Sequence, residues 1–73
     1  MSDRDPRRDP EPGDVIEKGM ISRTVVSANN ALDVSFTRRD YKGESTHRVQ
    51  LATWRAWCRA PSALVKWQRE WDA

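Results

Sequence analysis

The chain has 73 residues, of which 33% are charged and 37% are hydrophobic. This length suits one small domain with a modest core and excludes two domains. No apolar run reaches the roughly 20 residues of a membrane-spanning helix, and the N-terminal region is charged and proline-rich where a signal peptide would be hydrophobic. We therefore expect a soluble, cytoplasmic protein.

The cysteine and histidine content limits the possible sites. Cys58 is the only cysteine and His47 the only histidine, which excludes an internal disulfide and a four-ligand zinc site of these residues. They are also the only conventional pair of a nucleophile and a base, and no third orienting group accompanies them. The sequence shows no glycine-rich phosphate loop or cofactor motif. We predict a protein that is not an enzyme and needs no metal or cofactor.

Residues 1–13 differ in character from the rest of the chain. They contain three prolines and mixed charges but almost no apolar side chains, so ordering them would bury too little surface to offset the lost chain entropy. We predict a disordered tail over residues 1–13 and a single domain over residues 14–73. An arm that folds on a partner, in which Arg7 and Arg8 would matter, is the alternative.

The pattern of the chain changes from Asp14 onward, because Val15 and Ile16 begin an apolar stretch. A turn at Pro12-Gly13 would precede a first strand, and the stretch 20–28, rich in β-branched residues, predicts a second strand. Asparagine tolerates the left-handed backbone of a tight turn, so Asn29-Asn30 predicts a two-residue hairpin after it.

Two further strands show the alternation of a sheet with one buried face. In the third strand the inward positions are Leu32, Val34 and Phe36. A polar loop over residues 38–43 follows, in which Gly43 can close a longer hairpin. In the fourth strand the inward positions are His47, Val49 and Leu51. Strands at this spacing indicate an antiparallel meander or a small barrel.

The last third of the chain predicts a helical cover for this sheet. Thr53 suits the N-cap position, and Trp54, Trp57 and Cys58 fall on one helical face. Because Pro61 lacks a backbone donor, we predict that one helix ends near residue 60 and a second begins at residue 61 or 62; a single kinked helix is the alternative. The apolar stripe of the second segment consists of Leu64, Trp67 and Trp71.

Three runs carry a family resemblance, namely Pro12-Gly13-Asp14-Val15-Ile16, Arg23-Thr24-Val25-Val26 and Leu32-Asp33-Val34-Ser35-Phe36. They resemble the start of small Src-homology-three-like barrels of uncharacterised bacterial and phage proteins. The tryptophan-rich tail 51–73 is not part of that pattern, and Gly19 is the only glycine where the family often has a glycine-rich loop. The resemblance implies a barrel that binds nucleic acid or peptide, and a phage or prophage origin.

The expected fold is therefore α+β and mainly β. We predict a small antiparallel Src-homology-three-like barrel, or a bent sheet of four to five strands, over Asp14 to Leu51. A C-terminal helical segment over residues 53–71, broken at Pro61, would cap it.

The charge distribution indicates an anionic partner. Residues 23–73 contain nine basic and five acidic side chains, a net charge of +4, and ten of the thirteen basic residues in the chain are arginine. Arginine suits bidentate phosphate contacts and stacking on bases. We predict a module that binds nucleic acid, with Tyr41 available to stack on a base. The candidate contacts are Arg38, Arg39, Tyr41, Lys42, Arg48, Arg55 and Arg59.

The tryptophans leave two further functions open. Trp54 and Trp57 suit the core, whereas Trp67 and Trp71 either dock on the barrel or form an exposed patch. The alternative function is a protein-interaction module, such as a phage protein that engages a host protein through Trp67, Trp71 and an open barrel edge. Because the cations of a helical tail would lie opposite its tryptophans, attachment to an anionic membrane surface is the third possibility.

Overall fold

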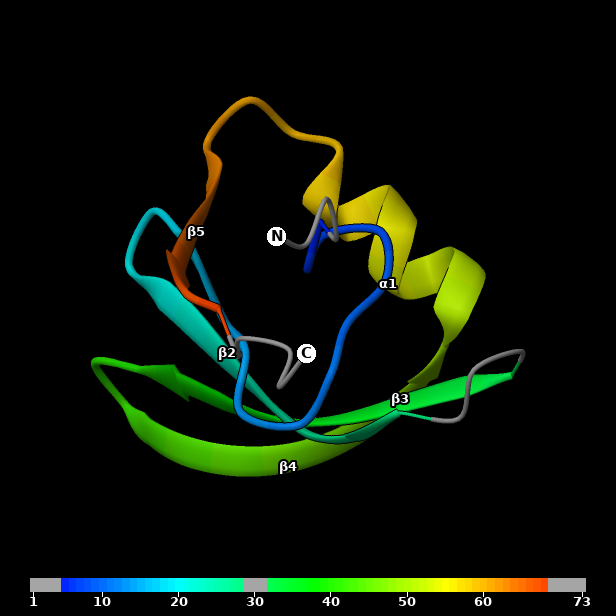
Figure 1. Ribbon diagram of the computed structural model, residues 1–73. Coiled ribbons are helices and arrows are strands. Elements are labelled where there is room, and N and C mark those ends of the chain that lie inside the picture. The colour runs from blue at the N-terminus through cyan, green and yellow to red at the C-terminus, as the bar shows by residue number, and fades with distance from the viewer. Residues whose placement is uncertain (1–4, 29–31, 69–73) are drawn as a thin grey trace.

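The computed structural model describes residues 5–28 and 32–68, which form one open antiparallel sheet with a short helix on one face (Figure 1). The elements in chain order are β1 (Val15–Lys18), β2 (Ile21–Ala28), β3 (Asp33–Asp40), β4 (Gly43–Gln50), α1 (Leu51–Cys58) and β5 (Ala63–Trp67). The strand order across the sheet is β4-β3-β2-β1-β5. The predicted class, α+β and mainly β with an antiparallel sheet of up to five strands, is confirmed. The described part of the chain contains no helix long and apolar enough to span a bilayer.

The β3–β4 hairpin is longer and tighter than the sequence predicts. Arg38 and Arg39 belong to β3, and only Tyr41 and Lys42 form the turn, in place of the predicted loop over residues 38–43. The carboxylate of Asp40 accepts a hydrogen bond from the Lys42 N–H at 2.8 Å, which stabilises the turn locally. Gly43 follows with a φ of 135°, a conformation that favours glycine. The predicted turn at Asn29-Asn30 lies outside the described residues.

The core lies between the sheet and α1. Ile16, Val25, Val34 and Phe36 on the sheet pack with Trp54, Cys58 and Ala63. The predicted alternation is confirmed at Val34 and Phe36, but the inward position of Leu32 is wrong, because this residue precedes β3 and is 61% exposed.

The predicted inward face of the fourth strand is confirmed only in part. His47 pairs with Phe36 in register, and their rings stack with centroids 5.7 Å apart, so His47 lies on the inner face. Its side chain is nevertheless exposed because β4 is an edge strand. Val49 is half-buried, and Leu51 is the first residue of α1 rather than part of a strand.

Helix α1 begins two residues before the predicted cap. Gln50 is its N-cap residue and makes no side-chain capping bond, so the assignment of Thr53 is wrong. The Leu51 N–H donates to the Leu32 carbonyl at 2.8 Å, so the chain that enters β3 satisfies a donor that a capping side chain would otherwise satisfy. The predicted apolar face is confirmed, since Trp54 and Cys58 are buried and Trp57 packs against the core.

The predicted second helix is wrong, because Ala63–Trp67 is strand β5. It pairs antiparallel with β1 from Val15 to Lys18 and so satisfies backbone groups on an edge that a helix would leave unpaired. The three-residue spacing of Leu64 and Trp67 also fits one face of a helix, which explains the wrong prediction. In strand β5 both side chains are exposed. The break that Pro61 predicts is confirmed, since α1 ends at Cys58. Trp71 lies outside the described residues.

Residues 5–13 lie against α1 and the core, which differs from the predicted disordered tail. Pro6 and Pro10 are buried, and the Trp54 indole N–H donates to the Pro6 carbonyl at 3.2 Å. Pro6 lies within a turn in which the Asp5 carbonyl accepts the Arg8 N–H at 2.9 Å. Proline rings supply apolar surface and lose little chain entropy on ordering, which a reading based on charge alone undervalues.

Candidate functional site

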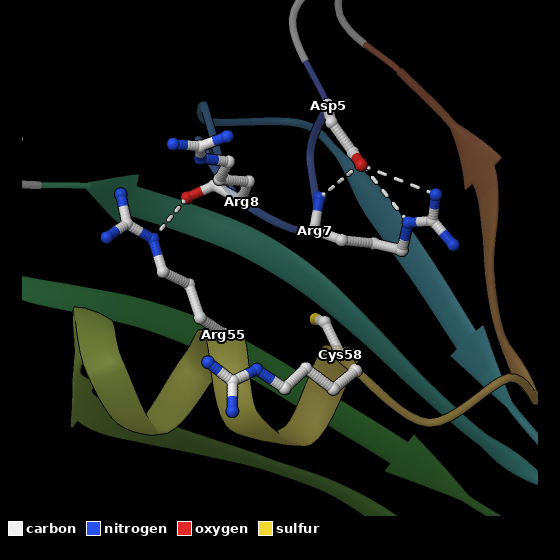
Figure 2. A pocket seen from close by; sticks show the side chains of 6 residues that line it. Asp5, Arg7, Arg8, Arg55 and Cys58 are labelled. Atoms are coloured by element: carbon white, nitrogen blue, oxygen red, sulfur yellow. Dashed lines mark hydrogen bonds and ion pairs between the residues drawn. The ribbon is translucent and has the colours of Figure 1, made fainter.

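A pocket of about 510 Å³ separates the N-terminal segment from the second half of α1 (Figure 2). Four arginines line it, and they come from two parts of the chain that are far apart in sequence. The lining residues are Asp5, Arg7, Arg8, Arg55, Cys58 and Arg59. The pocket therefore exists only because the N-terminal segment folds back beside α1.

Asp5 and Arg7 hold the N-terminal wall of this pocket in shape. The Asp5 carboxylate accepts hydrogen bonds from the Arg7 backbone N–H at 2.9 Å and from its Nε at 3.2 Å. Burial alone would raise the pKa of Asp5, but the hydrogen bonds from Arg7 and the charges of Arg7 and Arg8 outweigh it, so the pKa is lowered. Arg7 Nη1 also reaches the Ala63 carbonyl at 3.4 Å. Asp5 thus remains ionised and fixes the Arg7 guanidinium.

Arg55 fastens the N-terminal segment to α1. Its Nε donates to the Arg8 carbonyl at 2.9 Å (Figure 2). Its Nη2 also contacts the Asp9 carboxylate at 3.4 Å. Within residues 5–28 and 32–68, the side chains of Arg8 and Arg59 have no hydrogen-bond or ion-pair partner. The pocket therefore combines two anchored guanidinium groups, on Arg7 and Arg55, with two that are free to contact a ligand.

Cys58 adds a neutral group to this cationic pocket. Its side chain points from α1 toward the N-terminal segment (Figure 2) and is only 4% exposed. Burial raises the pKa of the Cys58 thiol to about 11, although Arg23 and Arg7 act in the opposite direction. The thiol is thus protonated at neutral pH, which makes it a weak nucleophile.

The lining suits an anion rather than a base or an apolar ligand. Guanidinium groups bind phosphate and carboxylate oxygens in a fork geometry, with stronger hydrogen bonds than neutral donors form. Asp5 is the only acidic residue in the lining, and none of the lining residues is aromatic. The geometry can therefore bind a phosphate-like group by charge and hydrogen bonding.

The remaining cations of the predicted set lie away from the pocket. Arg38 lies on the inner face of β3 and forms an ion pair with Asp40 at 2.6 Å. Arg48 lies on the outer face of β4 and forms an ion pair with Asp33 at 2.5 Å. Arg39 lies on the outer face of β3, opposite Glu44.

Tyr41 and Lys42 form the exposed turn of the hairpin. The structure thus brings Arg55 and Arg59 together with Arg7 and Arg8, which the predicted set lacks, and none of the hairpin residues lines the pocket. A usable signal for Arg7 and Arg8 was their place between two prolines, Pro6 and Pro10, because prolines can pack as apolar residues.

Arg23 forms a separate cluster with aromatic rings under the end of α1. Its guanidinium carbon lies 3.9 Å from the Trp57 ring centroid and 4.2 Å from that of Phe36. Lys18 Nζ lies 5.0 Å from the Trp57 ring and donates to the Trp57 carbonyl at 3.3 Å. Burial lowers the pKa of Arg23, and its Nε and Nη1 are buried without a hydrogen-bond partner among the described residues. These contacts attach α1 to the sheet.

Of the two tryptophans predicted to bind a partner, the structure describes only Trp67. Trp67 is 54% exposed at the end of β5. One edge of its ring approaches Gly13 so closely that a Cβ there would lie 3.1 Å from it. Trp71 lies outside the described residues, so the structure does not bear on its predicted role.

Comparisons with known proteins leave the site to be interpreted from its own chemistry. No family model, curated protein or solved structure matches this chain. Within the part of the chain that the structure describes, no group of three or more histidine, cysteine, aspartate or glutamate side chains could hold a metal ion. The described residues do form the arginine pocket, and its lining is the basis for the functional interpretation.

Proposed function

We propose that this protein is a small non-enzymatic module that binds nucleic acid by accepting backbone phosphates in the arginine pocket. The observation that carries this proposal is the convergence of Arg7 and Arg8 with Arg55 and Arg59 around one pocket that has a single carboxylate in its lining. Arg7 and Arg55 are already anchored, so less side-chain entropy is lost when a phosphate binds.

The chemistry of the lining supports phosphate contacts without base readout. Phosphate contacts position a nucleic acid but carry no direct sequence information, and the pocket lining offers no aromatic ring for stacking. We expect binding that is independent of sequence and falls steeply as salt rises, because each neutralised phosphate releases counterions.

The experiment compares two double variants that remove the same charge. Fluorescence anisotropy with labelled single-stranded DNA, double-stranded DNA and RNA at low ionic strength measures the affinity of the wild type, of Arg8→Gln/Arg59→Gln and of Arg39→Gln/Lys42→Gln. We expect the pocket variant to lose about tenfold or more in affinity and to reduce the salt slope by about two, and the hairpin variant to lose much less. Undetectable binding by the wild type, or equal losses in both variants, would reject the pocket.

We also propose a more specific fold, a cellular location and an origin for this protein. We propose a Src-homology-three-like barrel, supported by a meander from β1 to β4 and by the return of β5, after α1, to the free edge of β1. A cytoplasmic location and a phage or prophage origin follow from the sequence and the resemblance alone.

A protein-interaction module is the second candidate, favoured by the apolar side chains of β5. Leu64, Val65 and Trp67 are all exposed on this edge strand, whereas most apolar residues of β2 and β3 are covered. Exposed aromatic residues beside an open strand suit a protein partner. If this function is right, Trp67→Ala abolishes the capture of a host protein and leaves nucleic-acid affinity unchanged; unchanged capture would reject it.

A further inference from the structure

The two edges of the sheet are built differently. Strand β4 has eight residues without a proline, pairs with β3 at every position without a bulge, and exposes seven of its residues. Strand β5 has five residues and pairs with β1 through a bulge. Proteins usually blunt a free edge with a short strand, a bulge, a proline or repelling charges. Strand β4 is not short, has no bulge and contains no proline, and its two charged residues, Glu44 and Arg48, have opposite signs.

The tight turn determines which backbone groups of β4 face this edge. The residues that flank a two-residue hairpin turn form a hydrogen-bonded pair, so Gly43 and every second residue after it direct their N–H and C=O groups toward β3. The backbone groups of Glu44, Thr46, Arg48 and Gln50 therefore point to the free edge. The side chains of the same four residues lie on the outer face of the sheet, opposite the face of Phe36.

The charges of these residues are complementary to a second copy of the same strand. When two β4 strands run antiparallel about a two-fold axis at Thr46, Glu44 of each copy faces Arg48 of the other. Glu44 also lies opposite Arg39 within its own sheet, so each carboxylate would lie between two arginines. Arg48 is already held on the outer face by Asp33, with a contact of 2.5 Å. Opposite charges that face each other across strands are stabilising.

We propose that this protein forms a symmetric homodimer through β4, in which two five-stranded sheets join into one of ten strands. The register is set by Thr46 at the axis and by two reciprocal ion pairs between Glu44 and Arg48. This interface is distinct from the arginine pocket, and the dimer would present two such pockets on one particle.

Charge reversal tests the interface and its register together. Sedimentation velocity over a concentration series compares the wild type with Glu44→Arg, Arg48→Glu and the double variant Glu44→Arg/Arg48→Glu. Each single variant should weaken dimerisation about tenfold or more, and the double variant should restore it, because the exchanged charges again face each other. Lys66→Glu on β5 makes the same charge change as Arg48→Glu at the opposite edge and should leave the dimer intact.

Cysteine cross-linking locates the axis without changing charge. Thr46→Cys should form a disulfide with its own copy under mild oxidation, because paired Cα atoms at the axis lie about 5.5 Å apart. Thr37→Cys, next to Thr46 on the same face of β3, is the matched control and should not cross-link. The buried, protonated Cys58 should not contribute. Three results would overturn the proposal: a wild type that is monomeric at every concentration, a dimer whose stability does not change when the charges are reversed, and equal cross-linking of the two cysteine variants.

Discussion

The arginines of the β3–β4 hairpin and those of the pocket show two different uses of the same side chain. In the hairpin, Arg38 and Arg48 are each bound by a carboxylate of β3, and the alternation of the strand places Arg38 and Arg39 on opposite faces. In the pocket, arginines from residues 7–8 and 55–59 converge around one space. A run of cations on a strand is therefore dispersed by the sheet, and only tertiary contacts concentrate positive charge.

The substitution with the largest expected effect tests whether the N-terminal wall of the pocket is part of the folded core. Trp54 is completely buried and bonds to Pro6, so Trp54→Ala should cost about 3–5 kcal/mol of unfolding free energy, which approaches the whole stability of a domain this small. We expect urea unfolding followed by circular dichroism to show a mostly unfolded variant.

A milder change at the same position tests whether the N-terminal segment can detach while the β3–β4 hairpin stays folded. Trp54→Phe keeps an aromatic ring but removes the donor to the Pro6 carbonyl and leaves a small gap, at a cost of about 1–3 kcal/mol. Trypsin should then cleave after Arg7 and Arg8 faster than in the wild type, whereas cleavage after Arg39 should be unchanged. Equal acceleration at both places would show that the N-terminal segment has no separate attachment.

The next effect concerns the thiol in the pocket at high pH. Because folding raises the pKa of Cys58 from 9.0 to about 11, the native state retains a proton that the unfolded state loses between these values. Stability should therefore fall as pH rises from about 9 to 11, by roughly 2 kcal/mol. Urea unfolding at several pH values measures this loss. Lysines also titrate in this range, so Cys58→Ala is the control and should show a clearly smaller loss.

Two single arginine replacements compare the regions directly. Arg55→Gln removes bonds to the Arg8 carbonyl and the Asp9 carboxylate, and we expect a loss of about 1 kcal/mol. Arg48→Gln removes an ion pair in which Arg48 is 70% exposed, and we expect less than about 0.5 kcal/mol in dilute solution. Thermal or urea unfolding at low protein concentration measures both. An Arg48 effect as large as that of Arg55 would contradict the distinction between the two regions.

The sequence predicted those parts of the molecule that depend on neighbouring residues. Alternation at Val34 and Phe36, the helical face of Trp54 and the break at Pro61 were all readable because each depends on a local period or on one residue's chemistry. Strand β5 was not readable, since the free edge of β1, more than forty residues earlier, determines its conformation. The sequence predicted half of the arginines in the pocket. Arg55 and Arg59 were in the predicted set, whereas the positions of Arg7 and Arg8 depend on how Pro6 packs on Trp54.

Arg23 is an arginine that belongs to neither group, and the sign of its effect on stability is the open question. Its guanidinium is stacked between Phe36 and Trp57, and two of its buried nitrogens have no partner among the described residues. Arg23→Met keeps a long side chain between the rings and removes those donors, so unfolding free energy should change by less than about 1 kcal/mol in either direction. Arg23→Ala leaves a gap between the rings and should destabilise more. If Arg23→Met were as destabilising as Arg23→Ala, the positive charge itself would hold the two rings, through cation–π attraction.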